Sequence, residues 1–86
     1  MFLLVVYDTE HKNCAKLHKI LKYYLNWNQN SVFEGSVTAA QYAKIFALLE
    51  SNRVPGSHIT LYRVDSENIV KREEIGNSKG NISNIL

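Results

Sequence analysis

One carboxylate stands where a protein could hold a metal ion. Asp8 directly follows an apolar run, residues 2–7, and a helical pattern begins a few positions later. A short, valine-rich apolar run predicts a buried strand, so Asp8 would lie at its C-terminal end, where α/β sheets tend to bind ligands. Two interpretations stay open: Asp8 caps the following helix, or it binds a hard cation such as Mg²⁺, for which one or two carboxylates suffice.

Three lysines form a stripe on the first predicted helix, residues 11–25. Lys12, Lys16 and Lys19 recur about one turn apart, on the side opposite the apolar face of this helix. Lysines at this spacing can neutralise successive phosphates of a nucleic acid, but they are also common on the solvated face of an amphipathic helix. The net charge of +2 is too small to decide between the two interpretations.

The sequence argues against several other classes of site. No histidine or cysteine pair has a metal-ligand spacing, and the sequence contains neither a glycine-rich phosphate loop nor a GxSxG nucleophile elbow. The single cysteine, Cys14, falls on the apolar helix face, so we expect a buried and unreactive thiol. A lone cysteine fits a reducing compartment, and no run approaches the roughly 18 apolar residues of a membrane helix. We therefore expect a cytoplasmic protein with no membrane partner.

The elements that must position Asp8 alternate between strands and helices. We predict strands at residues 2–7, 31–34 and 58–64, and a charged edge strand from Ile69. The second helix, residues 39–51, opens with a capping box between Thr38 and Gln41. Residues 27–29 and 31–34 form either two short strands that meet at Asn30 or one bulged strand. This order predicts an α+β sandwich, a ferredoxin-like βαββαβ domain with an extra C-terminal strand over residues 1–75, followed by a flexible tail at 76–86.

The first strand also predicts a second copy of the chain. Residues 2–7 are apolar on both sides, yet right-handed crossovers would put both helices on one face of the sheet. A second sheet would cover the other face and give a two-fold homodimer, packed sheet to sheet. Such a dimer would bring two copies of Asp8 to one axis, and the tail could pair as an added strand with a partner chain.

These motifs together resemble the CRISPR-associated endoribonuclease family, the small adaptation proteins that partner the spacer-acquisition integrase. The resemblance is carried by VVYD at residues 5–8, QNSVFEG at residues 29–35 and ITLYRV at residues 59–64. It extends over roughly residues 1–75 of the chain. The resemblance therefore implies a ferredoxin-like homodimer with a divalent cation, Mg²⁺ or Mn²⁺, held at the dimer axis by Asp8, with Ser31 and Phe33 near it.

The resemblance implies two activities. In the first, the protein is a CRISPR adaptation subunit whose homodimer binds duplex DNA and scaffolds the integrase, with the stripe of Lys12, Lys16 and Lys19 on the DNA. In the second, it is a metal-dependent endonuclease that cleaves RNA or DNA, with Asp8 as the catalytic residue. An RNA-cleaving toxin of related fold is a third possibility.

Overall fold

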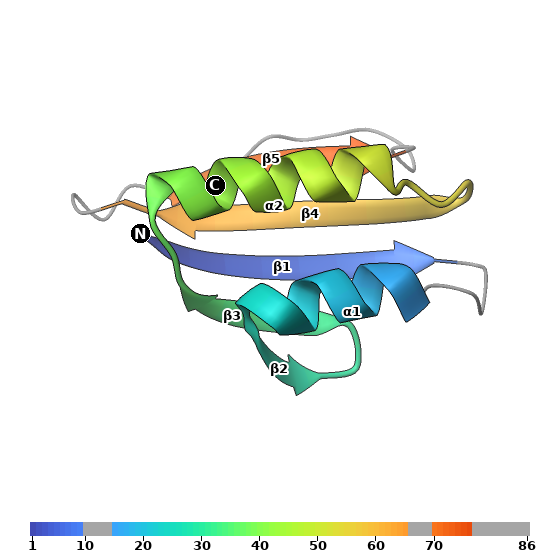
Figure 1. Cartoon of the computed structure of the whole chain (residues 1–86), viewed down its shortest axis with the longest axis horizontal. Coiled ribbons are helices and arrows are strands. Elements are labelled where there is room, and N and C mark those ends of the chain that lie inside the picture. The colour runs from blue at the N-terminus through green and yellow to red at the C-terminus, as the bar shows by residue number, and fades with distance from the viewer. Residues whose placement is uncertain (10–14, 66–69, 77–86) are drawn as a thin grey trace.

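A computed structural model describes residues 1–9, 15–65 and 70–76. In chain order, this part contains β1 (Phe2–Thr9), α1 (Ala15–Tyr24), β2 (Asn26–Gln29), β3 (Val32–Ser36), α2 (Ala39–Ser51), β4 (Ser57–Val64) and β5 (Val70–Gly76). The strands form one sheet in the order β2-β3-β1-β4-β5, in which every neighbouring pair is antiparallel. Both helices cover the same face of this sheet (Figure 1). The ferredoxin-like α+β fold with an extra C-terminal strand is therefore confirmed.

The central strand β1 divides its side chains between two faces. Val5 lies opposite Phe33 on β3 and Leu61 on β4, and all three are fully buried beneath the helices. The alternate residues Leu4 and Val6 point to the other face of the sheet, where they are half-buried. The core between the sheet and the helices comprises Leu3, Val5, Tyr7, Leu17, Leu21, Leu25, Phe33, Val37, Ile45, Leu49, Ile59, Leu61 and Ile75.

Helix α2 begins and ends where its local sequence predicts. The Gln41 backbone N–H donates to Thr38 Oγ1 at 3.1 Å, and the Thr38 N–H donates to Gln41 Oε1 at 2.8 Å. This capping box satisfies donors that the first turn leaves without a partner.

Helix α1 packs on the sheet through its apolar side, where Leu17 and Leu21 are buried. The predicted start of that helix, with Lys12 and Cys14, lies outside the described residues.

The segment between the helices is a hairpin of two strands. β2 and β3 pair antiparallel, and their register shifts between Trp27 and Gln29. Asn30, in the turn, has a φ of 47°, a left-handed conformation that asparagine adopts more readily than most residues. The structure therefore selects the two strands of the predicted alternatives, and it adds an irregularity within the pairing.

The edge position expected for the charged last strand is also observed. β5 pairs only with β4 among the described strands and stands at the end of the sheet order. The tail beyond Gly76 lies outside the described residues. None of the described helices is long and apolar enough to cross a membrane.

Candidate functional site

Asp8 is an exposed residue near the C-terminal end of β1. Because Leu3, Val5 and Tyr7 face the helices, alternation along the strand places Asp8 on the opposite side. We call this side, which no described helix covers, the open face. Asp8 lies opposite His58 of β4 in the antiparallel register.

The two residues that the resemblance associated with Asp8 lie in different places. The Tyr7 N–H donates to the Ser31 carbonyl at 3.1 Å, so Ser31 adjoins the end of β1 next to Asp8. Phe33 is fully buried under the helices, and its ring stacks on Tyr7 with centroids 6.2 Å apart. Phe33 therefore supports the strand that carries Asp8 from the other side of the sheet.

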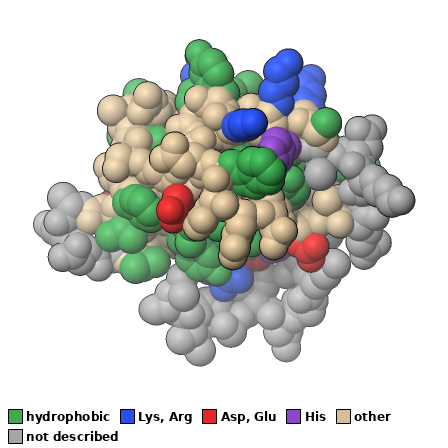
Figure 2. Space-filling model, turned by 90° about the horizontal axis from the view of Figure 1, so that it is seen from below, with side chains coloured by type: hydrophobic (Ala, Val, Ile, Leu, Met, Phe, Trp, Pro, Cys, Tyr) green, Lys and Arg blue, Asp and Glu red, His purple; other side chains and the backbone are tan. Residues whose placement is uncertain are grey.

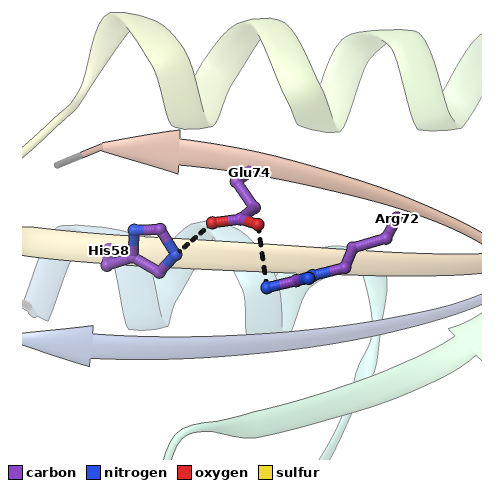
Figure 3. A network of polar contacts seen from close by, with 3 residues as sticks. All are labelled: His58, Arg72 and Glu74. Carbon is purple, nitrogen blue, oxygen red and sulfur yellow. Dashed lines mark ion pairs between the residues drawn. The ribbon is translucent and has the colours of Figure 1, made fainter. Parts of the chain in front are cut away.

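A network of polar side chains from β4 and β5 lies on the open face (Figure 3). Glu74 on β5 lies between two partners: its Oε1 is 2.8 Å from His58 Nε2, and its Oε2 is 2.8 Å from Arg72 Nη2. His58 and Glu74 are each only 18% exposed, so this contact is screened less than a surface pair. The network joins β4 to the edge strand β5 and holds the His58 ring, which lies opposite Asp8 in the strand register.

The described residues of one chain offer few ligands for a metal ion. The part of the chain that the structure describes contains no group of three or more His, Cys, Asp or Glu residues that could hold a metal. Mg²⁺ keeps several waters and is commonly bound by one or two carboxylates together with substrate phosphates. Asp8 thus fits such an ion only in part, and further oxygens would have to come from a second chain or from a phosphate.

The lysines lie on the other side of the sheet from Asp8. Lys16 and Lys19 are exposed on α1, whereas Lys12 is outside the described residues. Both exposed lysines border a shallow groove between the helices, whose lining residues are Lys16, Lys19, Ile20, Tyr23, Tyr24 and Leu48. They belong to the helix layer and Asp8 belongs to the open face, so one chain does not bring the two candidate sites together.

Several notable residues had no assigned role in the sequence. His58 pairs with Glu74. Arg72 joins the network on the open face, and Arg63 lies under α2 with its Cζ 4.9 Å from the centre of the Tyr42 ring. The signal for these positions is strand alternation, which puts residues 58, 72 and 74 on one face and 63 on the other once the register is known.

Comparison with known proteins gives a consistent result. A family model described as CRISPR associated protein Cas2 matches residues 1–72. A CRISPR-associated endoribonuclease Cas2 from Methanosarcina acetivorans is 36% identical over 100% of both chains. The protein of the same name from Pyrococcus furiosus is 37% identical over 100% of both chains, and that from Thermotoga maritima is 36% identical over 93% of each.

Proposed function

This chain belongs to the Cas2 family of CRISPR-associated proteins, and we propose that it is a subunit of CRISPR adaptation that binds duplex DNA as a homodimer and scaffolds the integrase. The DNA-binding part of this proposal rests on the positive charge of α1, which the uncharged strand β2 follows. Residues 15–29 include three lysines and no Asp or Glu, and Lys16, Lys19 and Lys22 are all exposed. A one-sided positive charge of this kind favours an anionic partner.

The composition of the open face supports the homodimer. Phe2 is 42% exposed there, and Leu4 and Val6 beside it are half-buried. A sheet face that remains in water usually alternates to polar residues, whereas a face that packs on another layer stays apolar. A second copy of the sheet on this face would bury these side chains. It would also give the assembled protein two lysine stripes, one on each of its two outer helix layers.

Charge reversal on α1 tests the DNA-binding proposal. Lys16→Glu together with Lys19→Glu should weaken duplex binding at least tenfold in about 100 mM salt. The dependence of log K on log salt should become shallower by about 0.9 for each phosphate that the protein no longer neutralises. Titration of a fluorescently labelled blunt duplex by anisotropy, at several salt concentrations, measures both effects.

Lys44→Glu is the matched control, because Lys44 is an exposed lysine on the other helix. Lys44→Glu makes the same change in net charge as Lys16→Glu, but it should reduce the affinity for duplex DNA much less. Equal losses from the two single variants would mean that general charge rather than the α1 face governs binding. Unchanged binding by the double variant would refute the assigned surface.

A metal-dependent endonuclease is the second candidate function. It is favoured by the exposed carboxylate of Asp8 at a strand end and by the word endoribonuclease in the names of the relatives. In a sheet-to-sheet dimer, two Asp8 carboxylates would hold Mg²⁺ or Mn²⁺. Such an ion would stabilise negative charge on a phosphate and lower the pKa of a bound water. Asp8 itself would then position the ion at the scissile bond.

Asp8→Asn separates the two functions. The variant should lose cleavage of RNA or DNA in Mg²⁺ while it keeps the dimer and the affinity for a blunt duplex. Asp65→Asn removes a carboxylate at the opposite end of β4 and should leave cleavage intact. Undiminished cleavage by Asp8→Asn would exclude Asp8 as the catalytic residue. Spacer acquisition that survives the loss of cleavage would show that scaffolding alone is required.

A further inference from the structure

The one tryptophan of the chain stands at the exposed edge of the sheet. Trp27 lies on β2, the outermost strand on its side, and 51% of its surface is exposed. Large aromatic side chains are highly buried on average, so an exposed indole calls for an explanation. Neither of the two proposed functions uses it.

The indole is held in place by its neighbours. Its Nε1–H donates to the Asn30 carbonyl at 2.8 Å. The His18 ring meets it in a T-shaped contact with centroids 4.8 Å apart, and His18 also packs against the buried Phe33 at 5.1 Å. We call Trp27, His18 and Phe33 the Trp27 cluster. A ring that is already ordered loses little conformational entropy when a ligand packs on it.

The hydrogen-bond donor of the indole already has a partner within the chain. Nε1–H is its only hydrogen-bonding group, and Asn30 already accepts from it. The exposed part of the ring therefore offers a flat π-surface and no donor. A planar, apolar group can therefore pack on it without leaving a polar atom of the indole unpaired.

The surroundings of the Trp27 cluster are positively charged. Lys22 Nζ lies 5.7 Å from the centre of the indole ring, and Lys19 is exposed on the same helix. Seen from the β2 side, the molecule shows basic side chains and a histidine along one side of a hydrophobic patch (Figure 2). The ligand should thus combine a planar ring with a nearby negative charge. An unpaired nucleotide has both, whereas the bases of a duplex are stacked on one another and present only their edges.

We propose that Trp27 stacks on an unpaired nucleobase of single-stranded nucleic acid whose phosphate is contacted by Lys22. This inference rests on the proposed nucleic-acid binding of α1 and extends it from the duplex to a single-stranded segment, such as an overhang. Base–aromatic stacking tolerates any sequence, because every base has a π-face.

The single tryptophan makes the test direct, since all indole fluorescence comes from position 27. Addition of an oligothymidylate of about 12 nucleotides to the full-length protein should quench this fluorescence, and a blunt duplex should quench it much less. In anisotropy titrations, Trp27→Ala should weaken binding of the labelled oligothymidylate by about tenfold or more, as expected when one base loses its aromatic stacking partner. Affinity for the blunt duplex should stay within about twofold, because its bases are not free to stack on the ring.

Trp27→Phe is the conservative control, because it keeps a ring for stacking and should keep most of the affinity. Circular dichroism and size-exclusion chromatography of both variants check the fold and the oligomeric state. Oligothymidylate that binds without quenching, or binds equally well to Trp27→Ala, would overturn the inference while leaving the α1 proposal standing. If oligothymidylate binds tightly and quenches the fluorescence while the blunt duplex does not bind, the inference is upheld and the duplex proposal is refuted. If the tryptophan fluorescence changes on addition of the integrase subunit but not on addition of nucleic acid, Trp27 contacts a protein and the inference is overturned.

Discussion

At the scale of single residues, Tyr42 sits in an unusual environment. Its hydroxyl oxygen is buried under α2 and has no hydrogen-bond partner among the described residues. Burial raises the pKa of Tyr42 above its ordinary value of 10.0, and the negative charge of Glu73 raises it further, while the nearby Arg63 opposes the rise. The folded protein therefore holds the phenol proton more tightly than the unfolded chain does.

This environment predicts a loss of stability at alkaline pH. Below about pH 10, both states keep the proton and the contribution is constant; above it, the unfolded chain loses the proton first, so the free energy of unfolding falls as pH rises. Tyr42→Phe should remove the part of this decrease in the free energy of unfolding that comes from ionisation of Tyr42. At pH 7 the variant should be as stable as the parent or up to about 1 kcal/mol more stable, because it no longer buries an unpaired hydroxyl.

Urea unfolding of parent and variant at neutral pH and between about pH 9.5 and 11 measures the difference. Tyr23→Phe is the control, because Tyr23 is 81% exposed and its removal should leave the pH dependence unchanged. Parallel alkaline profiles for the parent and Tyr42→Phe would contradict the prediction.

At the scale of elements, the start of α2 depends on one side chain. Thr38 accepts from the Gln41 N–H and shares the capping box with it. Thr38→Ala should lower the free energy of unfolding by about 1 kcal/mol, the usual effect of losing such a cap. Thr38→Ser keeps the hydroxyl and should lose little. The midpoint of urea unfolding compares the three proteins, and equal losses in both variants would show that the methyl group matters rather than the hydrogen bond.

The elements that could be predicted are those with local signals. The bounds of α2 were readable because the capping box and the apolar spacing are local. The asparagine-rich hairpin was ambiguous, because residues 26–31 contain turn-forming side chains at several possible turn positions. A left-handed Asn30 and a register shift after Trp27 are set by pairing with β3, which the local sequence does not encode.

The candidate site was predictable to a similar degree. The position of Asp8 follows from the end of an apolar strand, which is visible in the sequence. The contact between His58 and Glu74 joins residues on different strands, and it depends on the register of β4 against β5. The exposed Trp27 was visible as a residue, but its exposure follows from the edge position of β2 in the sheet.

At the scale of the whole molecule, the two candidate sites lie on opposite sides of one sheet. The lysines are on the helix layer, whereas Asp8 is on the open face with the apolar side chains of β1. A dimer through the open face would leave the lysines accessible and would bring the Asp8 residues towards each other. A sheet-to-sheet dimer would thus be compatible with both proposed functions.

A charge on the open face tests this dimer. Val6 lies between Val32 and Thr60 in the sheet register and projects from the open face near its middle. Val6→Lys would bury an unpaired ammonium between the two sheets, so it should raise the dimer dissociation constant by about 100-fold or more. Sedimentation equilibrium measures that constant for the parent and the variant. Ala43→Lys adds the same charge to the exposed side of α2 and should leave the dimer intact.

The loss of the dimer should carry over to DNA. The two lysine stripes of the dimer lie on its two outer helix layers, so one duplex reaches both only if it crosses the side of the dimer. With such a duplex path a monomer offers one stripe in place of two, and Val6→Lys should weaken duplex binding by at least about tenfold, although it removes no basic side chain. A Val6→Lys protein that remains dimeric would place the interface elsewhere on the surface. A monomeric variant with full duplex affinity would show that one stripe suffices and that the second copy serves Asp8 or the integrase rather than DNA.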